Sequence, residues 1–298
     1  MEYAFLAALF FAWSVTCARQ STRHHGPDVA NAGRILVALA VMGAWVSLSG
    51  RHVVAPGWEW LVLSGALGLG LGDIALFNAL PRIGPALTIL IMQCLAAPFA
   101  LAIEYLMLGT TIRWAQALAA AVILLGVALA LGAPPEGSDD RRERRVGILL
   151  GVLAAFGQAC GAVSTPLAHH ACDLAGATMP DGISQALVRL LGGVPIVLGF
   201  VLWQARSGGL LAGLPRPYDR ARGPLWMVMN GLSGPALGVA CYQYALTHHP
   251  AAIVLSIVAL TPIIALQMQW ASEGRRPGWR AWLGGAVAVL GVVLLRNA

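Results

Sequence analysis

The most constraining feature of this sequence is a pattern of apolar segments that occurs twice. Segment 63–80 ends in Phe77-Asn78-Ala79-Leu80, and segment 229–246 ends in Gln243-Tyr244-Ala245-Leu246. Further along the chain, Trp114 recurs as Trp279, 165 residues later. A tandem duplication in an apolar chain is typical of membrane proteins built from two repeats with a ligand site between them.

The amino-acid composition indicates that this chain lies in a lipid bilayer rather than in water. Charged residues make up 11% of the sequence and apolar residues 58%, whereas a soluble domain carries about 25% charged residues. A bilayer core needs about 20 apolar residues per helix, and backbone amides in hydrocarbon must bond within their own segment. We therefore expect an all-α integral membrane protein with ten transmembrane helices. Its apolar stretches lie at 3–19, 31–49, 58–78, 85–107, 113–132, 147–168, 183–205, 224–246, 251–271 and 278–296.

A polar run divides the chain into two halves. Residues 134–146 contain prolines, acids and arginines and form the predicted linker. The first five-helix repeat then covers residues 1–133 and the second covers residues 147–298. Because each repeat has an odd number of spans, the second must enter the membrane in the opposite sense. The sequence therefore predicts two inverted repeats.

The distribution of arginine predicts the orientation in the membrane. All 19 basic residues are arginine. With ten spans, the side that shares the N-terminus holds only Arg51, Arg113 and Arg296, whereas the other side holds fourteen arginines, including the loop Arg141–Arg145. The positive-inside rule places that loop in the cytoplasm and both termini outside. The predicted location is a bacterial-type cytoplasmic (inner) membrane, which the chain crosses many times.

Other motifs do not indicate a cofactor, a metal or a nucleic acid. The five cysteines are odd in number and include no Cys-x-x-Cys pair, so we expect small apolar core residues. Adjacent histidines such as His169 and His170 point about 100° apart on a helix and chelate poorly. Glycines 68, 70 and 72 lie inside an apolar segment with no preceding strand, which does not fit a nucleotide-binding loop.

Several weak motifs in a fixed order carry a family resemblance. Arg34 and Arg189 occupy the second segment of each half, and glycine-rich third segments end in Ala-Leu. Thr261-Pro262 and Glu273-Gly274 follow in the second half. Over nearly its whole length the chain resembles the EamA-type transporters of the drug/metabolite transporter superfamily. The resemblance implies a secondary transporter of small metabolites, often an exporter of amino acids or related compounds, and also cytoplasmic termini, against the arginine count.

Three charged residues inside predicted spans are the first candidate site residues, because a charge at the bilayer centre costs about 2.5–3.5 kcal/mol to insert. Asp73 follows Gly70-Leu71-Gly72 in the third segment. It is a proton or cation relay, a ligand for a substrate ammonium, or a fixed partner of Arg34. Arg34 and Arg189 occupy matching positions, and each either binds a substrate carboxylate or ties helix ends together.

An uncharged set of polar and aromatic residues is the predicted lining of a cavity. Amides and phenols inside a bilayer need partners from neighbouring helices, water or substrate. Trp13 and Phe156 occupy matching positions and could form apolar walls or gates; interhelical packing is the alternative for each residue. The predicted lining consists of Trp13, Asn78, Gln93, Phe156, Gln158, Asn230, Tyr242 and Gln243, with Gln185 and Tyr244 as further members.

Two function classes remain from the sequence. The first is a secondary transporter that works by alternating access between the two repeats, with protons coupled through Asp73 if transport is coupled. The second is an intramembrane enzyme acting on a lipid or isoprenoid, but no Asp-x-x-Asp pair, His-Glu-x-x-His run or Ser/His/Asp set appears in the spans. The expected partners are a small-molecule substrate and the lipid bilayer, without nucleic acid, for a monomer or a homodimer.

Overall fold

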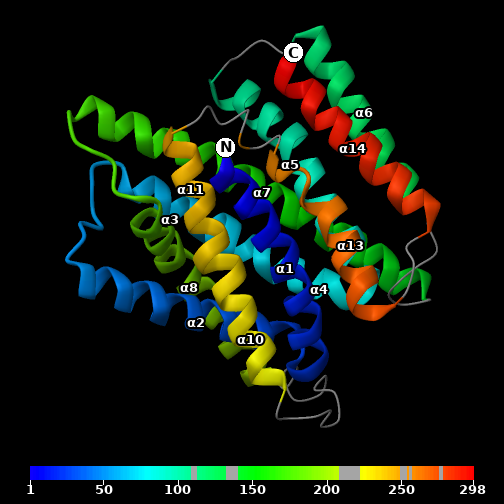
Figure 1. Ribbon diagram of the computed structural model, residues 1–298, viewed down its shortest axis with the longest axis horizontal. Coiled ribbons are helices and arrows are strands. Elements are labelled where there is room, and N and C mark those ends of the chain that lie inside the picture. Colours follow the sequence, from blue (N-terminus) through cyan, green and yellow to red (C-terminus); the bar gives the residue numbers. More distant parts are fainter. Residues whose placement is uncertain (109–112, 132–139, 208–221, 249–253, 255–256, 275–277) are drawn as a thin grey trace.

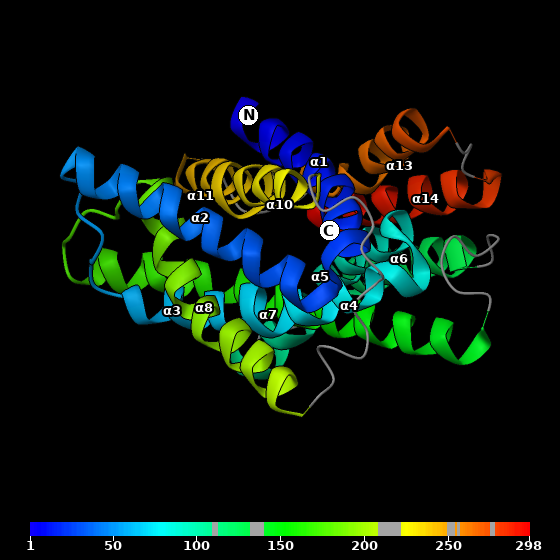
Figure 2. The same cartoon turned by 90° about the horizontal axis from the view of Figure 1, so that it is seen from below.

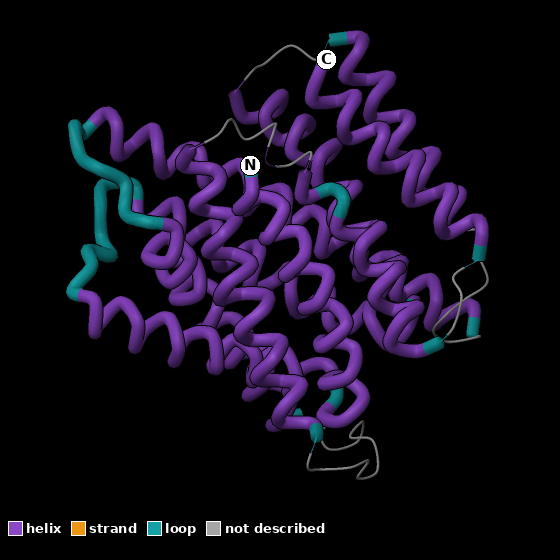
Figure 3. The backbone as a smooth tube through the Cα atoms, viewed as in Figure 1, coloured by secondary structure: helices purple, strands orange, loops and turns teal. Residues whose placement is uncertain are grey.

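The secondary structure of the described residues consists of helices joined by short loops, without a strand (Figures 1 and 3). The computed structural model describes residues 1–108, 113–131, 140–207, 222–248, 254, 257–274 and 278–298. The first half contains α1 (Glu2–His25), α2 (Pro27–Ser49), α3 (Trp58–Gly65), η1 (Ala66–Gly72), α4 (Asp73–Ile83), α5 (Pro85–Leu108) and α6 (Trp114–Leu131). The second contains α7 (Arg141–Leu174), α8 (Gly182–Arg206), α10 (Gly223–Gly231), η2 (Leu232–Gly238), α11 (Val239–His248), α13 (Thr261–Glu273) and α14 (Trp279–Asn297).

Glycine and proline set two of the sharpest turns between helices. Gly26 separates α1 from α2 with a φ of 78°, and Gly84 separates α4 from α5 with a φ of 79°. Residues with a side chain rarely adopt this backbone region. Pro27 and Pro85 then begin the next helices, where the missing amide hydrogen has no cost. A single residue therefore separates the two helices at each place.

The helices agree with a multi-pass membrane protein. Six helical segments are long and apolar enough to cross a bilayer, namely Pro27–Ser49, Trp58–Ile83, Pro85–Leu106, Arg141–Leu174, Gly182–Arg206 and Trp279–Asn297. Trp114–Ala130 is a shorter apolar helix. Large apolar side chains point outward; Leu48 is 89% exposed and Leu106 is 79% exposed. Such a surface suits lipid and would be unusual in water.

Each half contains a π-helical stretch at the same repeat position. The third apolar segment of the first half is continuous from α3 through η1 into α4, and its counterpart runs from α10 through η2 into α11. The two π-helices, Ala66–Gly72 and Leu232–Gly238, are offset by 166 residues. The glycine-rich sequence predicts close helix packing but did not predict this wider helical form, which is frequent at functional sites.

Equivalent helices of the two halves pack against each other in opposite directions. Arg51, just beyond the end of α2, bonds to Asp181, which caps the start of α8. At the other end of this pair, Gln204 of α8 donates to Asp28 of α2 at 3.5 Å. α2 and α8 therefore run antiparallel (Figure 2).

The last helices of the two halves form a second pair of this kind. A methyl group at Gly126 of α6 would meet the backbone of Ala288 in α14. Conversely, a methyl group at Gly291 of α14 would meet Ile123 of α6. Gly126 and Gly291 are 165 residues apart, as are Ile123 and Ala288. The contact is therefore reciprocal, and Figure 1 shows α6 and α14 side by side at one edge of the molecule.

Candidate functional site

A central cavity is built from both halves of the chain. It has an empty volume of about 620 Å³, which includes space open to the surroundings. Three charged side chains reach it: Arg34 from α2, Asp73 from the start of α4 and Arg189 from α8. Its other lining residues are Phe11, Ser14, Val15, Leu69, Leu76, Ile89, Met92, Gln93, Gln158, Gly234, Pro235, Val239 and Tyr242.

A second cavity of about 460 Å³ adjoins the first. Gln93, Gln158 and Tyr242 line both, so these three residues mark the junction. The remaining wall is apolar and mostly small: Ala96, Ala97, Ala100, Ala162, Val258, Ala259 and Val292. The charged cavity therefore adjoins a smaller and mostly apolar one.

Arg34 and Asp73 form a buried ion pair at the wall of the central cavity. The guanidinium bonds to one carboxylate oxygen of Asp73, and both side chains are at least 90% buried. Nε of Arg34 also donates to Asn31 at 3.1 Å, and the guanidinium lies 4.6 Å from the ring centroid of Phe77. Such a geometry combines a charge-assisted hydrogen bond with a cation–π contact. In this conformation Asp73 is therefore the ion-pair partner of Arg34.

Arg189 occupies the matching position in the second half but has different surroundings. It is 4% exposed, and its Nε has no hydrogen-bond partner among the described residues. No ion pair joins its guanidinium to another described residue either. Asp73 is near enough to attract it electrostatically, although Asp73 is bonded to Arg34. Arg189 is therefore a buried cation that faces a cavity and has no counterion of its own within the described part of the chain.

Each arginine packs against the π-helix of the opposite half. A methyl group at Gly234 of η2 would lie 3.3 Å from the Arg34 guanidinium, and one at Gly68 of η1 would lie 3.6 Å from the Arg189 guanidinium. The backbone contacts are reciprocal too. Gly231 faces the carbonyl oxygen of Arg34, and Gly65 faces that of Arg189. Glycine at these positions lets the helices approach closely enough to bring both cations to the centre.

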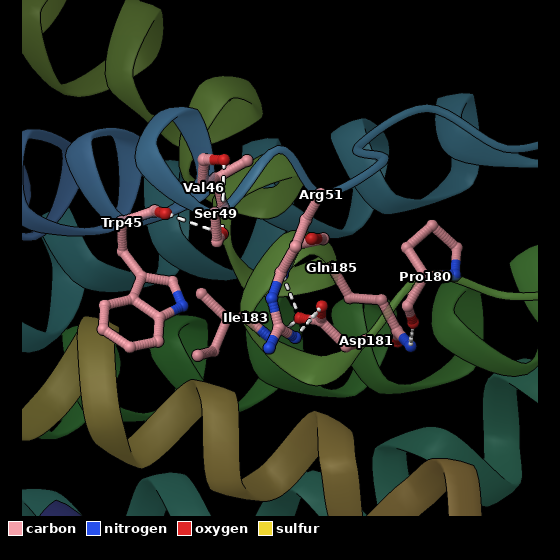
Figure 4. Close-up of polar contacts among 9 residues, drawn as sticks. Trp45, Val46, Ser49, Arg51, Pro180, Asp181, Ile183 and Gln185 are labelled. Atoms are coloured by element: carbon pink, nitrogen blue, oxygen red, sulfur yellow. Dashed lines mark hydrogen bonds and ion pairs between the residues drawn. The ribbon is translucent and has the colours of Figure 1, made fainter.

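One end of the antiparallel α2 and α8 pair is closed by a polar cluster outside the spans. Asp181 accepts the backbone N–H groups of Ile183 and Ser184 at 2.9 and 3.0 Å, so it caps α8, and it also bonds Arg51 (Figure 4). Burial raises the pKa of Asp181. The hydrogen bond and positive charge of Arg51, together with the two backbone N–H groups, lower this pKa by more, so its net value lies below the usual one.

The structure brings only part of the predicted lining together. Gln93, Gln158 and Tyr242 line the cavities with Arg34, Asp73 and Arg189. Asn230 is fully buried and accepts a hydrogen bond from Ser14 at 2.7 Å, and Gln243 is also fully buried. Neither is among the lining residues of the two cavities.

The remaining predicted residues also lie outside the two linings. Asn78 bonds to Asp28 at 2.9 Å, Gln185 bonds to the Pro180 carbonyl at 2.7 Å, and Tyr244 stacks on His248. Trp13 is half-buried and contributes to neither lining.

Trp13 and Phe156, which could form apolar walls or gates, line neither of the two cavities. Phe156 is 47% exposed and packs edge-on against Phe99. Trp13 and Phe156 occupy equivalent positions in the two repeats. Phe156 nevertheless lies on the outward face of α7, whereas Gln158, two residues later, faces the cavity. The apolar walls include Phe11, Leu69 and Leu76. In the sequence, these apolar side chains cannot be distinguished from core residues.

Comparisons with known proteins agree with this architecture. The model of the EamA-like transporter family matches the chain twice, over residues 2–132 and 145–297. A solved crystal structure with 20% sequence identity superimposes with a TM-score of 0.65 and covers 98% of this chain and 94% of its own. No curated protein matches the chain. The family model spans nearly the whole sequence, and the protein therefore belongs to the EamA-like transporter family.

Proposed function

We propose that the protein is a secondary transporter, and specifically an exporter, of a small amphipathic metabolite such as an amino acid or a related compound. The observation that carries this proposal is the central cavity, because its charged residues come from α2 and α4 of one half and α8 of the other. A site shared by two halves can be exposed to either side when the halves move relative to each other.

The proposed mechanism is alternating access between two inverted five-helix repeats, residues 1–133 and 147–298, joined by the linker 134–146. Three observations support an inverted relation. The π-helices occur at one repeat position, α2 runs antiparallel to α8, and α6 and α14 make reciprocal glycine contacts. Ten spans follow if the helices outside the six apolar segments also cross the bilayer.

The proposed location is a bacterial-type cytoplasmic membrane, with the Arg141–Arg145 loop in the cytoplasm. The arginine asymmetry supports this orientation. Figure 1 draws the start of α1 and the end of α14 toward the same side of the molecule, which agrees with an even number of spans. A reporter fused to either terminus measures the orientation directly: an externally active reporter should be functional and a cytoplasmic one inactive.

The direct test is transport without ATP. Purified protein in proteoliposomes is expected to exchange a radiolabelled member of an amino-acid and organic-acid panel across the membrane, against empty liposomes as the control. The rate should saturate with substrate concentration. Absence of exchange for every member of a broad panel, by protein that remains folded in the same vesicles, would contradict the proposed function.

A further inference from the structure

We infer that Arg189 is the anchor for the carboxylate of the substrate, and that the substrate class is a small monocarboxylate with an apolar body. The inference rests on the proposed function, since it assigns a ligand to the same central cavity. It begins from a difference between two residues that the repeat would make equivalent, Arg34 and Arg189.

The two arginines have unequal partners because the halves differ at two positions. Arg34 bonds Asp73 and lies over Phe77. The residues 166 positions after these two are Val239 and Gln243. Val239 lines the cavity together with Arg189 but carries no charge. The second half therefore keeps the cation and lacks the acid that neutralises it in the first half.

A buried guanidinium without a counterion is costly, and it is most easily explained where a ligand supplies the charge. The described lining of the cavity contains two cations, Arg34 and Arg189, and one anion, Asp73. One additional negative charge makes the site neutral. A carboxylate supplies one charge and two coplanar oxygens, which match the parallel N–H groups of a guanidinium. A phosphate dianion would leave an excess negative charge in the same space.

The second cavity accounts for the rest of the substrate. It begins at Gln93, Gln158 and Tyr242 and continues between alanine and valine side chains. Amide and phenol groups at the junction can bond a polar substituent near the carboxylate, whereas the alanine walls accept only an apolar body. Asp73 is bonded to Arg34, so a substrate ammonium has no free carboxylate among the lining residues. An amino group is therefore not required for binding.

The experiment compares three compounds that share the five-carbon 3-methylbutyl framework. Binding of 4-methylpentanoate, leucine and 3-methylbutylamine to purified protein is measured by thermal stabilisation and by calorimetry, with the same trio repeated on shorter, longer and aromatic skeletons. The carboxylates should bind at least as well as the matching amino acids, and the amines should not bind. Inorganic phosphate serves as the anion without an apolar body and should bind at least about ten-fold more weakly than the best carboxylate.

Two variants test the anchor from opposite directions. Arg189→Gln removes the cation, and Val239→Asp adds an acid beside it at the position equivalent to Asp73. Each should weaken carboxylate binding by about ten-fold or more, which is the usual scale for a hydrogen bond to a charged group. Val239→Asn has the size of the aspartate without its charge and should weaken carboxylate binding less than Val239→Asp does. Thermal melting without ligand checks that each variant is folded.

The outcomes separate this inference from the proposed function. Carboxylate binding that survives in Arg189→Gln, tight binding of amines, or equal loss in Val239→Asp and Val239→Asn overturns the anchor, even if the protein transports substrate. Absence of carboxylate binding across the panel also overturns it. If carboxylate binding depends on Arg189 but the protein transports none of these compounds, Arg189 is still the carboxylate anchor and transport of this substrate class is rejected.

Discussion

Gly65 of α3 lies so close to Arg189 of α8 that a methyl group on Gly65 would come within 1.7 Å of the Arg189 carbonyl oxygen. The opposing atom belongs to the backbone, so a side chain cannot simply move aside. The contact joins the two halves at the helix turn that carries the unpaired cation. A substitution at Gly65 therefore tests whether the close approach of α3 and α8 requires glycine.

Replacement of Gly65 by alanine is therefore expected to separate α3 from α8. The variant should lower the thermal melting temperature and the yield of folded protein, because overpacking costs about 1–3 kcal/mol and here the clash is with backbone. Gly199→Ala is the matched control, since it lies in α8 and a methyl group there meets nothing within 4 Å. Equal melting of the two variants would show that the close approach does not contribute to stability.

The Arg34 and Asp73 pair should behave as one energetic unit. Removal of one partner leaves a buried charge uncompensated and costs about 3–5 kcal/mol. We expect Asp73→Asn and Arg34→Gln each to be strongly destabilising, and the double variant to lose less than the sum of the two. A double-mutant cycle on melting or denaturant unfolding measures this coupling. Additive losses would mean that the two side chains contribute independently.

Asp73 is also the proposed coupling residue if protons drive transport. In Asp73→Asn protein that remains folded in the vesicles, substrate exchange would then lose its dependence on an imposed pH gradient, while exchange without a gradient continues. Proteoliposomes with equal and unequal internal pH measure both conditions with the same label. An unchanged response to the gradient in the variant would remove Asp73 from the coupling role and leave it as the structural partner of Arg34.

The Asp181 cluster predicts a loss of stability in acid. The pKa of Asp181 is lowered in the folded protein, so its contribution is present above the unfolded pKa of about 3.9 and disappears as pH falls through the folded value. Asp181→Asn should weaken this acid dependence but keep the helix cap. Asp181→Ala removes the cap as well and should cost about 1 kcal/mol more at neutral pH. Melting curves from pH 7 to pH 3 compare all three proteins, and identical curves for the two variants would contradict a capping role.

The sequence predicts the helices better than it predicts the site. Apolar length and the positions of glycine and proline suffice to place the helices, because backbone hydrogen bonding in a bilayer permits few alternatives. The π-helices were not predicted, because glycine and Pro235 indicate close packing or a kink without specifying the helical form.

The site is less predictable because it depends on which way each side chain points. Gln93, Gln158 and Tyr242 reach the cavities, whereas Phe156 points outward and Asn230 is used to bond Ser14. Helical period alone does not separate these cases. The absence of an acid at Val239 is visible in the sequence, but its meaning requires the knowledge that Val239 and Arg189 line one cavity.

The most direct test of alternating access is to measure whether the junction of the two cavities can be reached from each side of the membrane. Gln93→Cys, in a protein whose five cysteines have been replaced, is treated with a membrane-impermeant thiol reagent added to one side of sealed vesicles of known orientation, and then to the other. Alternating access predicts labelling from both sides, with bound substrate changing the ratio of the two rates. Labelling from one side only, whatever the substrate concentration, would contradict a site that opens in turn to each side.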